Sequence, residues 1–229
     1  MPAQSFNQEA EIGYHLNDPA TPPSLEEQAF LEQDMRLWVP DFPQVFAGKD
    51  ILDLGGGRGT ASMLISRKFA PRSITHFDLS HKRLTAAREW QRSQSNYFIV
   101  CGSVYELPFP DQTFDLIISN SFLHHLPNVQ MALSEAGRVL RPGGLYVGRE
   151  PNFNNPLVRL GVFSPLSRLI MGASNHSQNE YPLRAQEIEA GFIQAGCQPD
   201  LQYFWRRIPG LRHPLLSVAI SVRGYRTHS

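Results

Sequence analysis

Residues 50–62, with the sequence DILDLGGGRGTAS, hold the pattern that decides the fold of this chain. The mostly apolar start of the stretch predicts a buried strand, and four glycines follow within five residues. Glycine has no Cβ, so it adopts unusual backbone conformations and lets the backbone approach a ligand closely. A helical pattern begins at residue 60, and a helix N-terminus offers free N–H groups to a carboxylate. The stretch therefore predicts a strand, a ligand-binding loop and a helix.

The spacing of these glycines separates several classes of ligand. A phosphate-binding loop needs GxxxxGK[ST], and no lysine follows the glycines here. The dinucleotide pattern GxGxxG also fails, because a threonine or a serine stands at its last position. The pattern present is Asp53-x-Gly55-x-Gly57-x-Gly59, with one residue between successive glycines. Neither of the two phosphate-binding patterns describes this loop.

Strand-like and helix-like segments alternate along the chain. Strands are expected at 50–54, 73–79, 96–102, 114–119, 145–150, 197–208 and 215–225, and helices at 60–70, 81–93, 128–140 and 183–196. This alternation predicts a parallel sheet covered by helices on both faces. Right-handed crossovers then place the strand-to-helix loops at the carboxyl edge of the sheet, where open sheets bind ligands.

Two segments fall outside the alternation. A helix is expected over residues 24–38, where Ser24 and Glu27 form a capping box. The apolar residues of this helix predict that one of its sides packs against the protein; they are Leu25, Phe30, Leu31, Met35, Leu37 and Trp38. After residue 150 the sequence mixes Pro, Asn, Gly and apolar residues without a period. We expect residues 152–181 to be an insertion over the carboxyl edge, either a lid or substrate-binding element or a surface excursion that only packs.

Composition limits the class of protein. With 41% hydrophobic and 18% charged residues, the 229-residue chain is typical of a globular protein with one substantial core. No apolar run approaches the roughly 18–20 residues of a membrane span, and residues 1–15 lack the basic and apolar regions of an export signal. Cys101 and Cys197 have no metal-ligand spacing, so we expect a reduced, cytoplasmic protein without a metal.

Charge is spread unevenly along the chain. Residues 1–50 hold nine acids and two bases, whereas residues 201–229 hold five arginines and no acid, within a net charge of zero. We expect the two ends to neutralise each other across the fold. The alternative is that the basic tail contacts nucleic acid or an anionic surface.

Three further motifs share the order and spacing of one known family. They are HFDLS at 76–80, LPFPDQTFDLIISNSFLHHL at 107–126 and RVLRPGGLYV at 138–147. Together with the glycine loop they resemble the class I S-adenosylmethionine (SAM)-dependent methyltransferases, in their small-molecule branch. The resemblance covers residues 45–150 well and 180–225 in outline. It implies a Rossmann-like three-layer α/β sandwich, with a seven-stranded, mostly parallel sheet whose last strand is antiparallel.

The resemblance also implies a cofactor, SAM, with S-adenosylhomocysteine (SAH) as product, and assigns it a site. The cofactor-binding residues it implies are Asp53, Gly55, Gly57, Gly59, Asp78, Leu79, Ser103, Val104 and Asn120. Asp78 would accept hydrogen bonds from both ribose hydroxyls, and such charged bonds contribute roughly 1.5–3 kcal/mol. Leu79 would pack on the adenine. Asp53 would lie near the methionine amino group, or would orient the glycine turn without touching the ligand.

Ser103 departs from the family pattern. Relatives commonly carry an acid there that binds the adenine amino group, whereas this chain has a hydroxyl. The serine or the backbone of Val104 can still accept that hydrogen bond. Asn120, just beyond the fourth strand, would face the methyl donor.

His124 and His125 are the candidate catalytic residues, because histidine titrates near neutrality and both follow the fourth strand. Packing or capping is the alternative for each, since methyl transfer can proceed by orientation alone, without a general base. Residues that could meet the acceptor are Glu150, Asn152, His176, Glu180 and Tyr181.

The acceptor class is narrowed by missing motifs. Residues 119–122 are SNSF where methyltransferases of base amines carry [DN]PPY, and no Pro-Cys pair for cytosine stands there. A small-molecule acceptor is therefore expected, held by residues 45–229 with residues 1–44 as an N-terminal cap. The alternatives are a non-catalytic SAM-binding or partner-binding protein, a nicotinamide-dependent oxidoreductase, and a nucleic-acid methyltransferase that uses the basic tail.

Overall fold

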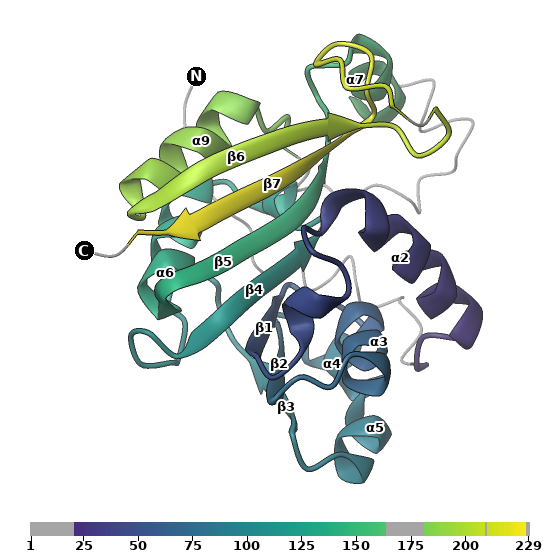
Figure 1. The fold of residues 1–229 in the computed structure, drawn as a ribbon, viewed down its shortest axis with the longest axis vertical. Coiled ribbons are helices and arrows are strands. Elements are labelled where there is room, and N and C mark those ends of the chain that lie inside the picture. The colour runs from purple at the N-terminus through teal and green to yellow at the C-terminus, as the bar shows by residue number, and fades with distance from the viewer. Residues whose placement is uncertain (1–20, 164–180, 209, 228–229) are drawn as a thin grey trace.

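Seven strands form one mixed sheet in the computed structural model, which describes residues 21–163, 181–208 and 210–227 (Figure 1). Their order is β3-β2-β1-β4-β5-β7-β6, and β7 runs antiparallel to both of its neighbours. The strands are β1 (Asp50–Leu54), β2 (Ser73–Asp78), β3 (Tyr97–Cys101), β4 (Phe114–Asn120), β5 (Leu140–Pro151), β6 (Cys197–Phe204) and β7 (Ala219–Arg226). The predicted Rossmann-like sheet with an antiparallel last strand is confirmed.

Helices cover both faces of the sheet and give the molecule three layers (Figure 1). The α-helices are α2 (Leu25–Trp38), α3 (Thr60–Lys68), α4 (His81–Thr85), α5 (Arg88–Ser93), α6 (Val129–Val139), α7 (Pro156–Phe163) and α9 (Ala185–Gln194). Two short 3-10 helices, η2 (Gln44–Phe46) and η3 (Leu123–His125), complete the described helices. One apolar core lies between the sheet and the α2–α3 side, and the other between the sheet and α6 with α9.

β1 shows why a central strand carries apolar residues on both faces. Ile51 packs in the core beside α2 and α3, whereas Leu52 and Leu54 pack in the core beside α6, and all three are buried. A strand buried on both faces reads as a nearly continuous apolar run. Because β1, β2, β4 and β5 run parallel, their carboxyl ends meet at one edge of the sheet, and the loops that follow them build the site.

The predicted helix over residues 24–38 is α2, and its capping box is present. The Ser24 Oγ accepts the Glu27 N–H at 3.1 Å, and the Glu27 carboxylate accepts the Ser24 N–H at 2.6 Å. The packed side is narrower than predicted, because Leu25 and Phe30 are 68% and 59% exposed. The buried apolar face instead consists of Leu31, Met35 and Trp38. Those positions follow the helical period, and the two exposed residues lie off that face.

Two other expectations are corrected. The helix predicted over residues 81–93 divides into α4 and α5, because the N–H groups of Ala86 and Ala87 bond carbonyls three residues back rather than four. The strand predicted over residues 145–150 begins earlier, because β5 starts at Leu140. There Leu140 pairs with Phe114 and Leu145 with Leu116, so the residues between Leu140 and Leu145 bulge out of the ladder.

No ion pair joins the acidic and the basic ends of the chain among the described residues. Acids of α2 and β1 pair with bases of the first 149 residues, as in Arg36–Glu32, Lys68–Glu32, Arg72–Asp50 and Arg149–Asp34. Of the five arginines after residue 200, only Arg223 forms a described ion pair, with Asp200 at 3.1 Å. Arg206 stacks on Phe30 of α2 and lines the same hollow as Glu26, Glu27 and Asp34, without a described ion pair to them. The expected neutralisation across the fold stays a prediction.

None of the helices in the described ranges is both long enough and apolar enough to cross a lipid bilayer.

Candidate functional site

The glycine loop is left-handed at alternate positions. Gly55, Gly57 and Gly59 have φ of +69°, +58° and +87°, a region that favours glycine. At Gly55 the reason is also steric, because a Cβ there would stand 2.2 Å from the Phe122 ring. The loop therefore needs glycine for its own shape and for its contact with the segment after β4.

Asp78 ends β2 and holds the loop in place. One carboxylate oxygen accepts the Gly57 N–H at 2.8 Å, and the other accepts the Ser80 N–H at 2.8 Å. The side chain is buried yet lines a cavity. Each carboxylate oxygen has a second acceptor site, so Asp78 can bind two further donors without giving up its backbone bonds.

Most of the predicted cofactor residues come together around one cavity. Its walls include the predicted residues Gly55, Asp78, Leu79, Ser103, Val104, Asn120 and His125. A second hollow adjoins the glycine loop and is lined by Asp53, Gly57, Thr60 and Asn120. Gly59 lines neither hollow and serves as the N-cap of α3. The structure thus places eight of the nine predicted cofactor residues on two hollows that share Gly55 and Asn120.

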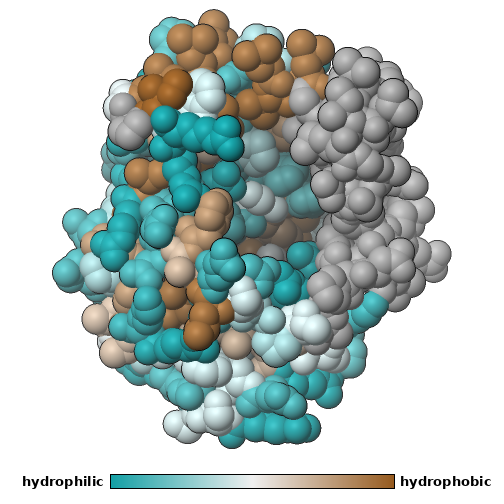
Figure 2. Space-filling model, turned by 90° about the vertical axis from the view of Figure 1, so that its right-hand side faces the viewer, coloured by the Kyte–Doolittle hydropathy of each residue, from teal (hydrophilic) through white to brown (hydrophobic). Residues whose placement is uncertain are grey.

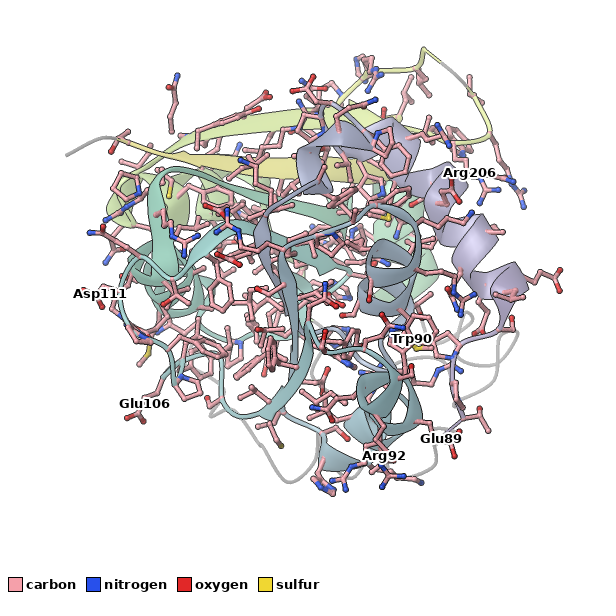
Figure 3. The ribbon with its side chains drawn as sticks, turned by 60° about the horizontal axis from the view of Figure 1, so that its bottom comes forward. Glu89, Trp90, Arg92, Glu106, Asp111 and Arg206 are labelled. Carbon is pink, nitrogen blue, oxygen red and sulfur yellow. The ribbon has the colours of Figure 1, made fainter. Side chains whose placement is uncertain are left out.

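A third hollow lies beneath α2. Phe30, Leu31, Asn120, Arg149 and Arg206 are among the residues that line it. Figure 2 views the molecule from the side on which α2 lies in Figure 1 and shows that this face is hollowed. In Figure 3, Arg206 reaches toward α2, where its guanidinium stacks 3.9 Å from the centre of the Phe30 ring.

Asn120 lies where the three hollows meet. Its amide oxygen is buried and has no hydrogen-bond partner among the described residues. A buried amide oxygen without a partner costs free energy, about 1–3 kcal/mol. The position therefore suits a ligand group that donates a hydrogen bond.

Asp53 fastens β1 to the first turn of α3. Its Oδ2 accepts the Ser62 N–H at 3.1 Å and also accepts the Ser62 hydroxyl. Burial raises the pKa of this carboxyl, an effect that His76 and Ser62 oppose. These bonds agree with the alternative in which Asp53 orients the glycine turn.

His76 is a functional neighbour that the sequence did not single out. Its Nε2 lies 2.9 Å from the Gly57 carbonyl, which can only accept, so Nε2 carries the proton and Nδ1 accepts from the Tyr97 hydroxyl at 3.1 Å. Burial lowers the pKa of this histidine, which favours the neutral ring. The available signal was a polar ring in the buried run of β2.

Glu150 holds the turn that carries the two predicted catalytic histidines. Its carboxylate accepts the N–H groups of Phe122 and Leu123 at 3.0 and 2.9 Å, and the Nδ1–H of His124 at 2.7 Å. Burial alone would raise the pKa of Glu150, but His124 and the backbone donors outweigh it, so the pKa lies below its ordinary value of 4.5. His124 is thus directed into the protein, whereas His125 lines the cavity.

Of the four other acceptor-facing candidates, the structure describes Asn152 and Tyr181. The Asn152 amide donates to the carbonyls of Pro214 and Ser217 at 2.8 and 2.7 Å, so it ties the end of β5 to the loop before β7. The Tyr181 N–H donates to the His124 carbonyl at 2.8 Å. His176 and Glu180 lie outside the described residues. No three His, Cys, Asp or Glu side chains of the described ranges gather to hold a metal ion.

Comparison with known proteins agrees with this geometry. A family model described as a methyltransferase domain matches residues 52–148. The fatty-acid O-methyltransferase of Mycolicibacterium smegmatis is 30% identical over 167 residues, which cover 71% of this chain and 61% of that protein. The demethylmenaquinone methyltransferase of Tropheryma whipplei is 36% identical over 130 residues, which cover 55% and 53%. The chain thus spans 53–61% of the length of these relatives.

Solved structures share the fold. Phosphoethanolamine N-methyltransferase 2 of Haemonchus contortus, in complex with SAM, has a TM-score of 0.66 at 15% identity, over 96% of this chain and 57% of that one. A SAM-dependent methyltransferase of Mesorhizobium loti has a TM-score of 0.63 at 16% identity, over 87% and 98%. At these identities the likeness establishes the fold alone.

We predict that Glu150→Gln destabilises the protein by about 2–3 kcal/mol at pH 7, because it removes the charge that several buried donors share. A carboxyl whose pKa is lowered by folding stabilises the fold above its ordinary pKa and loses that contribution as pH falls. The difference between wild type and variant should therefore be constant above about pH 6 and shrink below pH 4.5.

Urea unfolding of both proteins between pH 7 and pH 4 measures this difference. Glu106→Gln is the matched control, because Glu106 is exposed and points away from the molecule (Figure 3), so it should match wild type at pH 7. A difference for Glu150→Gln that stays the same at pH 7 and pH 4 would show that Glu150 is not held ionised in the fold.

Proposed function

Because residues 52–148 belong to the methyltransferase domain family, we propose that this chain transfers the methyl group of SAM to a small-molecule acceptor and releases SAH. One observation carries the proposal. Three adjoining hollows meet at Asn120, with the fixed carboxylate of Asp78 on one side and the space beneath α2 on the other. That arrangement offers one place for a cofactor and a separate place for an acceptor.

The residues present fit SAM. Asp78 would hold the ribose, because its two oxygens keep acceptor sites toward the cavity after binding Gly57 and Ser80. Leu79 and Val104 would pack beside the adenine, and Ser103 would offer it a hydroxyl. When bound, SAM supplies an electrophilic methyl group on a positively charged sulfur.

The methionine end has a matching set of groups. The glycine loop and the N-terminus of α3 border the second hollow, where free N–H groups attract a carboxylate. The unpartnered amide oxygen of Asn120 would accept from an amino group or from the acceptor. Asp53 would act on this end through the shape of the loop.

We place the acceptor beneath α2. Phe30 and Leu31 give this hollow an apolar wall. Its charged lining is mixed, because Arg149 and Arg206 lie among Glu26, Glu27 and Asp34, and Asp34 pairs with Arg149 at 3.2 Å. Similar proteins are named for a fatty acid and for demethylmenaquinone, both lipophilic molecules. An acceptor with an apolar portion therefore fits this space.

Orientation would supply most of the rate, since well-aligned reactants can gain about 7–11 kcal/mol. Of the two candidate histidines, His125 lines the cofactor cavity and would act as a base only on an acceptor atom that reaches past Asn120, where that cavity meets the hollow beneath α2. His124 would position the turn through its bond to Glu150.

Calorimetric titration with SAM, SAH and NAD in parallel tests the proposal. We expect micromolar binding of the two sulfur ligands and none of NAD. Binding of NAD alone would favour the nicotinamide-dependent alternative, and binding of none of the three would overturn the cofactor site. Binding of SAM without SAH formation with any lipophilic acceptor would favour a non-catalytic SAM-binding protein.

We predict that Asp78→Asn weakens SAM binding by at least about tenfold, because a neutral amide loses charged hydrogen bonds to the ribose and tenfold corresponds to about 1.4 kcal/mol. Calorimetry on Asp78→Asn and on the control Glu106→Gln measures the change. A thermal melt of each variant separates loss of binding from loss of fold. Unchanged affinity in folded Asp78→Asn would place the ribose elsewhere.

A further inference from the structure

Two segments far apart in the sequence lie side by side at the carboxyl edge of the sheet. One runs from the end of β5 through α7, residues 151–163, and the other joins β6 to β7, residues 204–217 (Figure 1). The register brings their strand ends together, because Pro151 pairs with Ala219 and Phe204 also pairs with Ala219. The Asn155 amide adds a bond to the Leu216 carbonyl at 3.0 Å. We call these two segments the edge surface.

The edge surface exposes large apolar side chains. Of the eleven exposed large hydrophobic residues in the described ranges, five lie on it. They are Leu157, Leu160, Ile208, Leu215 and Leu216, with exposures from 46% to 73%. Figure 2 shows hydrophobic side chains gathered along the top of the molecule, the end at which α7 lies in Figure 1. A gathered apolar surface of this kind marks an interaction site more often than single exposed leucines do.

The same surface is basic. Residues 151–163 and 204–217 contain four arginines, Arg159, Arg206, Arg207 and Arg212, and no aspartate or glutamate. Arg159, Arg207 and Arg212 are exposed, and no described carboxylate forms an ion pair with them. Among the residues that the structure describes, no ion pair therefore cancels the charge of these three arginines.

We propose that the edge surface docks on an anionic lipid bilayer. Leucines and an isoleucine can enter the acyl boundary, while the neighbouring guanidinium groups stay at the level of the charged headgroups. Nucleic acid would satisfy the arginines but would leave the exposed leucines in water. The bilayer is the partner that matches both chemistries at once.

The surface adjoins the proposed acceptor site. Arg206 belongs to the 204–217 segment and also lines the hollow beneath α2. A lipophilic acceptor could then pass from the bilayer to that hollow without crossing bulk water. This delivery role rests on the proposed methyltransferase function, whereas the docking itself does not.

Vesicle flotation with the full chain tests the docking. The vesicles are phosphatidylcholine alone and phosphatidylcholine mixed with phosphatidylglycerol, each at low and high salt. We expect binding to the anionic vesicles that weakens as salt rises, because screening acts on the arginine contribution. No binding to anionic vesicles at low salt would overturn the proposal.

Two double variants separate the contributions of charge and of apolar contact. Arg207→Gln with Arg212→Gln, and Leu215→Gln with Leu216→Gln, should each reduce partitioning by about tenfold or more. The matched controls are Arg92→Gln on α5, exposed at the far end of the molecule (Figure 3), and Ile193→Gln on α9, 65% exposed next to the start of β6. Controls that lose as much binding as the variants would contradict the proposal.

The other occupants give distinct results. Binding to single-stranded oligonucleotides with no binding to vesicles would make the surface a nucleic-acid site. If the chain is a dimer that does not bind vesicles, and the double variant Leu215→Gln with Leu216→Gln is monomeric, the edge surface would be an interface between two copies. Calorimetry with SAM on each variant checks the cofactor site independently. Docking without SAM binding would leave the proposal standing and would refute the proposed function.

Discussion

Buried carboxylates that accept backbone N–H groups are the constraint on which the site depends. A parallel sheet ends several strands at one edge, and the irregular loops there must satisfy their polar backbone groups without a ladder. Asp78 does so at the end of β2, for the glycine loop and for the start of α4. Glu150 does so at the end of β5, for the turn after β4. Each carboxylate thereby fixes a loop that comes from a different strand.

The two fixed loops meet where Gly55 faces the ring of Phe122. Phe122 donates its N–H to Glu150, and its ring occupies the space that a Cβ on Gly55 would need. Asn120 lies two residues before that ring, with its amide oxygen unpartnered where the hollows meet. This buried amide oxygen therefore stands between loops that Asp78 and Glu150 hold in place, which is how a binding site is kept ready for its ligand.

The fold and the cofactor side of the site were accessible from sequence because they depend on backbone rules. Strand and helix periods, a capping box at Ser24 and the glycine spacing are local patterns, and the family resemblance supplied Asp78 at the end of the second strand. The acceptor side of the site depends on which groups each side chain contacts in the fold. Glu150 and Asn152 were expected to meet an acceptor, yet both bind backbone groups of segments distant in sequence. His76 carried no motif, and its bond to the Gly57 carbonyl exists only in the folded sheet.

The fold also decides which of the unevenly distributed charged residues lie close together. The sequence shows acids near one end and arginines near the other, and mutual neutralisation is the simplest expectation. In the fold several of the described N-terminal acids pair with bases of the first 149 residues, as Asp34 does with Arg149 and Glu32 with Lys68. The edge strand β6, which runs parallel to β5, instead carries the arginines of residues 204–217 to the carboxyl edge, beside the exposed leucines of α7. The strand that completes the sheet thus also brings the basic and apolar residues together at the edge where the site opens.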